Sequence, residues 1–105
     1  MPKPRSFRTT VVERARREPE FRVGLLTEAA ECFLTGEVDA AKIMLRDYVN
    51  ATLGFKALAA IVDKKPESLM RMLSEKGNPR ANNLAQLISS LRSHEGVTLR
   101  VEALR

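Results

Sequence analysis

The segment SLMRMLSEKGNPRANNL, residues 68–84, contains a short apolar-periodic run, an abrupt turn and the beginning of a second run. The triplet Gly77-Asn78-Pro79 interrupts the first run, because glycine and proline are the residues least compatible with a helix interior. A helix of about two turns is too short to be stable through its own packing. We infer that the first run is a brief helix held at the surface, where another molecule contacts it.

A second amphipathic helix is predicted immediately before this segment. Its apolar residues recur with the i, i+3, i+4, i+7 spacing of one helix face: Phe55, Leu58, Ala59 and Val62. Pro66 suits the first position of the short helix that follows. The inward-facing residues of that short helix are Leu69, Met72 and Leu73. Because only residues 63–65 separate the two helices, they are expected to pack at a steep angle, and the sequence predicts a helix-turn-helix over residues 55–75.

The helix after the Gly-Asn-Pro turn is predicted to support the short helix from beneath. Asn78 is expected to cap it, and Pro79 to occupy its first position, where the missing N–H costs nothing. Its buried face is predicted to consist of Leu84, Leu87, Ile88 and Leu91.

Three further helices are predicted upstream. A short one starts at the capping-box pattern of Thr10 and Glu13, and the next has Pro19 in its first turn and ends at Gly36. The apolar stripe of this second helix is Phe21, Leu25, Ala29, Cys32 and Phe33. Asp39 is expected to cap the third helix. The apolar face of that helix is Ala41, Leu45, Tyr48, Val49 and Thr52.

The period changes near the C-terminus. Val97, Leu99 and Val101 alternate with polar residues, which is the spacing of a β-strand over residues 97–102. A lone strand leaves its backbone polar groups unpaired, so we expect a two-fold homodimer in which this strand pairs with its copy. In that dimer the same three apolar residues form the interface. The alternative is a frayed tail that pairs with the edge of a partner's sheet.

Length and composition are those of one small domain. The chain has 105 residues, of which 44% are apolar. With the elements above, they predict an all-α fold of five to six helices with one short C-terminal β-strand. No apolar run is long enough for a membrane helix or a signal peptide, and a single cysteine excludes an internal disulfide framework. We therefore expect a cytoplasmic protein with no membrane partner.

Charge is divided unevenly along the chain, whose total is +5. Residues 1–17 carry six basic residues against one acid and are predicted to form a basic N-terminal arm, followed by a single domain over residues 18–105. Within that domain, residues 18–53 hold three basic residues against seven acids, whereas residues 54–80 hold six against three. Such an asymmetry can attract a phosphate backbone, although a solvated surface is the simpler explanation.

The outward face of the short helix is the candidate binding site. A helix about 10–12 Å across fits the major groove of double-stranded DNA, with basic groups at both ends positioned for phosphates. The predicted DNA-contacting residues are Lys56, Lys64, Lys65, Glu67, Ser68, Met70, Arg71, Lys76, Asn78 and Arg80.

The segment LAAIVDKKPESLMRML, residues 58–73, resembles the Xre/Cro, lambda-repressor-like helix-turn-helix. Residues 67–91, followed by VTLRV at 97–101, are similar to the addiction-module antidote and prophage regulator family, whose S-x-x-G-N-P motif matches Ser74 to Pro79. The similarity spans about residues 40–102. It implies a dimeric, autorepressing regulator on a pseudo-palindromic operator, with a small basic toxin as a possible partner. Residues 18–49 are similar to an extension found in a subset of transcriptional regulators.

The chain departs from the general motif in the turn. Asp63 stands where glycine is usual, and it can adopt a left-handed conformation at some cost. Lys64 and Lys65 replace a small apolar residue and a Ser or Thr cap. Because lysine cannot cap as serine does, some helix stability is lost, in exchange for a phosphate contact.

No pattern of catalytic or metal-binding residues emerges. His94 is the only histidine, Cys32 lies on an apolar stripe, and Glu28 and Glu31 fit a solvated helix face. We expect neither an enzyme nor a cofactor or metal. The competing function is a protein-interaction module in which the acidic residues 18–53 cover a basic toxin and DNA binding is weak or lost.

Overall fold

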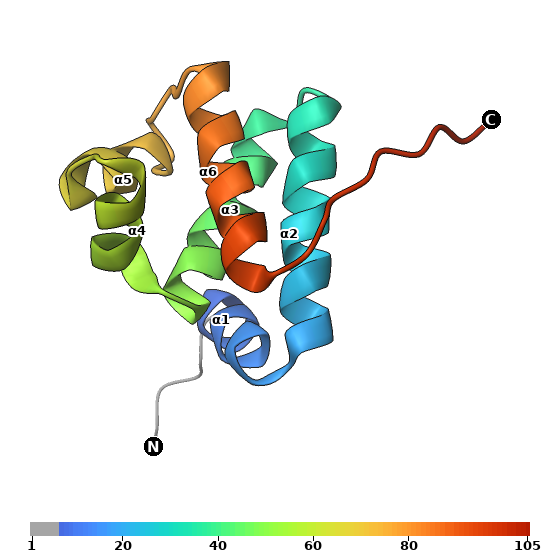
Figure 1. Cartoon of the computed structure of the whole chain (residues 1–105), viewed down its shortest axis with the longest axis horizontal. Helices are drawn as coiled ribbons and strands as arrows, with labels where there is room; N and C mark the ends of the chain where they lie inside the picture. Colours follow the sequence, from blue (N-terminus) through green and yellow to red (C-terminus); the bar gives the residue numbers. More distant parts are fainter. Residues whose placement is uncertain (1–6) are drawn as a thin grey trace.

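Six α-helices make up most of the computed structural model, which describes residues 7–105 (Figure 1). They are α1 (Phe7–Arg17), α2 (Pro19–Leu34), α3 (Val38–Ala51), α4 (Gly54–Val62), α5 (Pro66–Met72) and α6 (Ala81–Glu95). The all-α prediction and the number of helices are confirmed. None of the described helices is long and apolar enough to cross a lipid bilayer.

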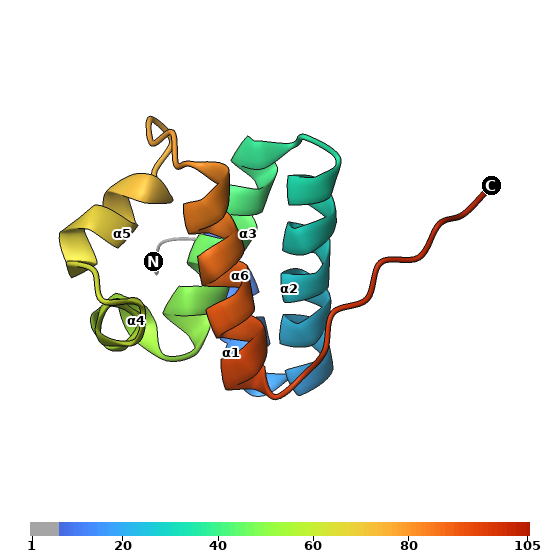
Figure 2. The same cartoon turned by 45° about the horizontal axis from the view of Figure 1, so that its top comes forward.

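The helices are arranged around a central pair. α3 and α6 lie in the middle of the bundle, with α2 on one side and α4 and α5 on the other (Figures 1 and 2). α1 packs across one end, against α2 and α3. α2, which holds much of the acidic segment, therefore lies on the opposite side of the molecule from the helix-turn-helix segment, while α3 lies between them.

The core consists of the predicted apolar stripes. Leu45, Leu58 and Leu69 are fully buried, and burial of such a side chain stabilises the fold by about 1.5–3 kcal/mol. Three buried apolar residues of the described chain lie outside the predicted stripes, namely Ala15, Leu26 and Ala51. Leu26 is buried because the apolar stripe of α2 is wider than the spacing from Phe21 indicates.

Proline marks two helix starts as expected, but the caps predicted at Asp39 and Asn78 are wrong. Pro19 and Pro66 each lie in the first turn of their helices. Asp39 lies inside the first turn of α3 instead of capping it, and forms an ion pair with a lysine one turn later. Asn78 does not cap α6, because the helix begins only at Ala81 and its N-cap is Arg80, with φ −71° and ψ 152°. Pro79 therefore precedes the N-cap and does not occupy the first helical position predicted for it, because proline favours extended backbone at the residue before it without obliging a helix to start there.

Most of the predicted N-terminal arm is helical. α1 begins at Phe7, so Thr10 is inside the helix and not at its cap. Ala15 is fully buried in the core, and the guanidinium of Arg14 lies 4.3 Å from the ring centroid of Phe21. The described part of the arm thus belongs to the bundle, while Lys3 and Arg5 lie outside the described residues.

The predicted C-terminal strand is not formed. After the left-handed cap Gly96, with φ 78°, residues 97–105 form neither helix nor strand. Val97 and Leu99 are half-buried against the core, but Val101 is 77% exposed, and the tail extends away from the bundle (Figure 1). The reason is physical: a β-ladder needs a second strand, and the described chain supplies none.

Candidate nucleic-acid interface

A left-handed residue ends α4 and reverses the chain. Asp63 has φ 54° and ψ 51°, the only positive φ of a non-glycine residue in the described chain. The backbone N–H of Lys64 donates to the carbonyl of Ala59 at 3.0 Å, which completes the cap. The sequence-based expectation for Asp63 is confirmed.

The start of α5 depends on backbone and proline, not on a side-chain cap. Lys65 is the N-cap residue and makes no capping hydrogen bond through its side chain, as expected for lysine. Its carbonyl accepts hydrogen bonds from the N–H groups of Ser68 at 3.0 Å and Leu69 at 3.2 Å. Pro66 supplies a φ that already suits the first turn. The Lys65 ammonium is therefore left available to a ligand.

The two faces of α5 differ sharply. Leu69 and Leu73 are buried and attach the helix to the core. On the outer face Met70 is 54% exposed and Arg71 is also exposed. At seven residues, α5 is about 10 Å long. It is a short, firmly anchored helix whose outer surface makes no contribution to the core.

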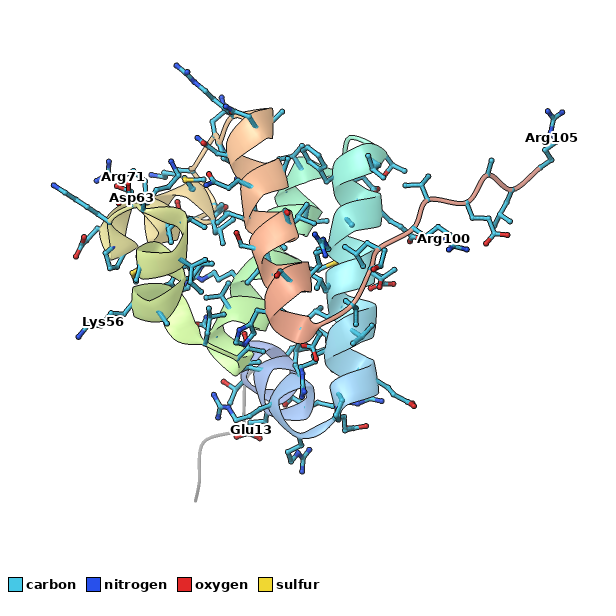
Figure 3. The ribbon with its side chains drawn as sticks, viewed as in Figure 1. Glu13, Lys56, Asp63, Arg71, Arg100 and Arg105 are labelled. Carbon is cyan, nitrogen blue, oxygen red and sulfur yellow. The ribbon has the colours of Figure 1, made fainter. Side chains whose placement is uncertain are left out.

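The predicted contact residues come from α4, α5 and the segments that flank α5. Those that are exposed are Lys56, Lys65, Glu67, Met70, Arg71, Lys76, Asn78 and Arg80. Lys64 and Ser68 are half-buried, so less of their surface is accessible. Figure 3 shows Lys56 pointing away from the bundle on the α4 side. Within the described residues, no carboxylate lies in ion-pair contact with Arg71, and Glu67, one turn earlier on α5, does not pair with it.

A buried lysine, which sequence reasoning missed, holds the turn after α5. Lys42 of α3 is only 3% exposed. Its Nζ donates to the carbonyl of Gly77 at 2.6 Å and to that of Glu75 at 3.4 Å, and lies 3.2 Å from a carboxylate oxygen of Asp39. The signal was present in the sequence, because Lys42 lies on the same helix face as Leu45.

Gly77 is required by close packing against the end of α5. A Cβ at this position would lie 2.1 Å from the carbonyl oxygen of Arg71 and 2.7 Å from that of Met72. No side chain fits there, since both atoms belong to the backbone. The sequence identified Gly77 as a helix breaker, but close approach of two backbone segments is its role in the structure.

A polar cluster joins the C-terminal end of α6 to α2 and α3. Arg22 Nε donates to both carboxylate oxygens of Glu95, at 2.9 Å and 3.1 Å, and the Tyr48 hydroxyl donates to the same carboxylate. Arg22 also reaches the carbonyl of Ala15 at 3.4 Å. Burial raises the pKa of Tyr48, and the hydrogen bond to Glu95 and its negative charge raise it further. Sequence analysis placed Tyr48 in the core but did not find its partners.

Nothing in the described chain suggests a metal centre. No group of three or more His, Cys, Asp or Glu side chains between residues 7 and 105 is placed to hold a metal ion.

Comparisons with protein-family models, with curated proteins and with solved structures yield no match for this chain. The similarity to helix-turn-helix regulators therefore rests on the quoted residues and stays a prediction.

Proposed function

We propose that this protein is a sequence-specific DNA-binding transcriptional regulator. The observation that carries the proposal is the geometry of α5: Leu69 and Leu73 anchor a seven-residue helix, while Met70 and Arg71 face solvent and make no contribution to the core. A surface helix of this size fits the major groove. Basic residues lie before and after it in the chain.

The proposed division of labour follows from side-chain chemistry. The guanidinium of Arg71 binds the O6 and N7 atoms of a guanine with two parallel hydrogen bonds, and the Met70 side chain contacts a thymine methyl group. Lys65, Lys76 and Arg80 bind phosphates and fix the register without reading the sequence. Asp63 and Gly77 make no contact in this scheme; they set the direction of α5.

The regulator acts as a homodimer in this proposal. A two-fold axis places two copies of α5 about 34–36 Å apart, one helical turn of DNA, facing a pseudo-palindromic operator. The family resemblance adds an antitoxin-like role, in which the protein represses its own gene and binds a small basic toxin. A short neighbouring reading frame that encodes a basic protein would support that role, and a stand-alone gene would favour a simple repressor.

A second candidate function uses the opposite side of the molecule. Five acidic residues of α2, α3 and the turn between them are exposed: Glu20, Glu28, Glu31, Glu37 and Asp39. Such a surface suits a basic protein partner and repels DNA. In this alternative the protein neutralises a toxin by covering it, with weak DNA binding or none.

Selection from a pool of randomised DNA duplexes tests the proposal directly. The full-length protein is expected to enrich one pseudo-palindromic motif, and Arg71→Ala is expected to lose or relax that enrichment. Arg46→Ala, at an exposed arginine of α3 outside the helix-turn-helix segment, serves as the matched control and should select the same motif. If no motif is enriched even at low ionic strength, the DNA-binding proposal is wrong and the protein-interaction alternative gains support.

A further inference from the structure

A groove runs along the α2 side of the bundle. It lies between α2, α6 and the beginning of the C-terminal tail, and has a volume of about 780 Å³. Four half-buried residues that pack against the core form its apolar floor: Phe33, Met44, Ile88 and Leu99. The tail itself supplies part of the wall through residues 100–102 (Figures 1 and 2). An occupant of the space between these walls therefore has to come from another molecule.

The groove is two helical turns long on both of its helices. On α6 the lining residues follow the i, i+3, i+4, i+7 spacing of one face: Ala85, Ile88, Ser89 and Arg92. On α2 the lining extends from Thr27 to Leu34, so each stretch is about 12 Å long. Ala85 and Ser89 are exposed and small, which lets another helix approach α6 closely. The space therefore fits a third helix, whose apolar side chains meet the floor at helical spacing.

The charged side chains of the groove are unpaired in the described chain. They are the acids Glu28, Glu31, Glu37 and Glu102 and the bases Arg92 and Arg100. None of the six takes part in an ion pair within residues 7–105. The exposed carboxylates outnumber the guanidinium groups, so the groove is negative although the whole chain carries +5. The thiol of Cys32, which also lines the groove, reports this charge: desolvation raises its pKa, and the charges of Glu37 and Glu28 raise it further.

We propose that this groove binds an amphipathic, basic helix of a partner protein. Two turns of that helix cover the floor with apolar side chains, and its lysine or arginine residues meet the unpaired glutamates of α2. The proposal goes beyond DNA binding and does not depend on it, because α5 lies on the other side of the bundle (Figure 1).

The size of the groove sets the expected affinity. A contact of two helical turns is smaller than the roughly 1,200–2,000 Å² buried in stable interfaces, so the complex should be transient. A dissociation constant on the order of 10 µM is expected. Because the protein is positively charged overall, a cationic peptide is not attracted to it non-specifically. Binding of such a peptide would therefore report the local charge of the groove.

Fluorescence anisotropy with designed peptides tests the proposal on the full chain without DNA. The probe is a labelled peptide of about 18 residues, long enough to form a helix, with leucines on one face and lysines beside them. One control peptide has glutamates in place of the lysines, and another has the same residues in scrambled order. Only the lysine peptide should bind at micromolar concentrations. Equal binding of the lysine and glutamate peptides would overturn the proposal.

Charge reversal in the groove should reverse this preference. Glu28→Lys/Glu31→Lys should weaken binding of the lysine peptide about tenfold or more and should admit the glutamate peptide. Glu20→Lys/Glu75→Lys, at two exposed glutamates outside the groove, is the matched control and should change neither affinity. Equal effects of the two double variants would mean that the overall charge determines binding, and the proposal would fail.

Two substitutions on α6 locate the site by shape. Ser89→Trp fills the groove and should abolish binding of the lysine peptide, whereas Ser93→Trp, one turn later and outside the groove, should not. Both serines are exposed, so circular dichroism should show unchanged helix content in both variants. If Ser89→Trp binds the peptide as tightly as the parent, or if both variants lose binding equally, the peptide does not occupy the groove.

The single thiol and the mass of the protein identify the occupant. Cys32 is the only cysteine and lines the groove, so saturating lysine peptide should slow its reaction with a thiol reagent severalfold. An unchanged rate would place the peptide elsewhere and overturn the proposal. If sedimentation shows that Ser89→Trp converts a dimer into a monomer, the occupant is a second copy of the chain and the partner-helix proposal is wrong. A protein that selects a DNA motif but binds no peptide would overturn this inference alone.

Discussion

Arg71 is the residue proposed to contribute most to recognition of the DNA base sequence. Its side chain is exposed on α5 and has no carboxylate partner in the described chain, so no intramolecular ion pair has to break on binding. Arg71→Ala should weaken binding to the selected duplex by about 1–3 kcal/mol, and binding to random duplexes only slightly. Lys65→Ala should weaken both alike. Fluorescence anisotropy with the two duplexes measures the difference, and equal losses for both variants would make Arg71 a phosphate contact.

Gly77 governs the turn through its missing side chain. Because a Cβ would lie 2.1 Å from a backbone oxygen, Gly77→Ala must displace the end of α5 and should lower the free energy of unfolding by about 1–3 kcal/mol. Gly24→Ala is the matched control. Nothing lies within 4 Å of a Cβ at Gly24, which sits inside α2, so the substitution should stabilise the protein by about 0.5–1 kcal/mol. Urea unfolding compares the two, and loss of stability by equal amounts would contradict the close-packing role.

At the scale of elements, the α5–α6 connection is held by α3 through one buried cation. Lys42→Met removes the donor to the Gly77 carbonyl while keeping most of the side-chain volume. The unpaired backbone oxygens should lower the free energy of unfolding by about 1–3 kcal/mol. DNA affinity should also fall, although Lys42 is buried and touches no ligand, because the turn that ends α5 loses its anchor. Arg46→Ala should change neither quantity. If the Lys42→Met protein is less stable but binds DNA with unchanged affinity, then Lys42 stabilises the fold without influencing DNA binding.

The cluster of Tyr48, Arg22 and Glu95 joins α2, α3 and α6, and it should give stability a characteristic pH dependence. The pKa of Tyr48 is raised above its ordinary value of 10.0 in the folded protein. Its contribution is therefore fully present below pH 10 and is lost as the pH rises through the folded-state pKa, because only the unfolded chain ionises readily. Tyr48→Phe should cost about 1 kcal/mol at neutral pH. The difference from the parent should shrink above pH 10 in thermal unfolding, and a constant difference would argue against the cluster.

The sequence predicts those structural features that are determined by residues close together in the chain. Leu45, Tyr48 and Leu69 were assigned to the core because helix periodicity alone decides which face they occupy. The left-handed conformation of Asp63 could also be predicted, since the tolerance of aspartate for this conformation is a property of the single residue. The prediction that Asn78 caps α6 is wrong, because the path of the connection between α5 and α6 determines which residue becomes the N-cap. That residue is Arg80.

Partners distant in sequence were not predictable in the same way. Lys42 and Gly77 are 35 residues apart, and Arg22 and Glu95 are 73 apart, so no local pattern relates them. The C-terminal segment shows the same dependence at the level of an element. Its alternation is that of a strand, but a strand forms only when a second strand supplies the ladder, and the described residues 7–105 supply none.

Across the whole molecule, charge and shape divide the protein into two sides. Residues 54–80, which contain the helix-turn-helix, carry six basic residues against three acids, and α4 and α5 lie opposite α2 (Figure 1). The exposed glutamates of α2 would be repelled by a phosphate backbone, so in the proposed complex the asymmetry should orient the protein with α5 toward DNA.

This division makes a quantitative prediction about ionic strength. If Lys56, Lys64, Lys65, Lys76 and Arg80 each neutralise one phosphate, counterion release makes the logarithm of the association constant fall by about 4–5 for each tenfold rise in salt, per protomer. Lys76→Ala should reduce that slope by about 0.9. Arg46→Ala, on α3 and outside the helix-turn-helix, should leave the slope unchanged. Anisotropy titrations over a range of salt concentrations measure it. A complex insensitive to salt would mean that these cations do not contact phosphate, and the acidic side would then become the surface to test for partners.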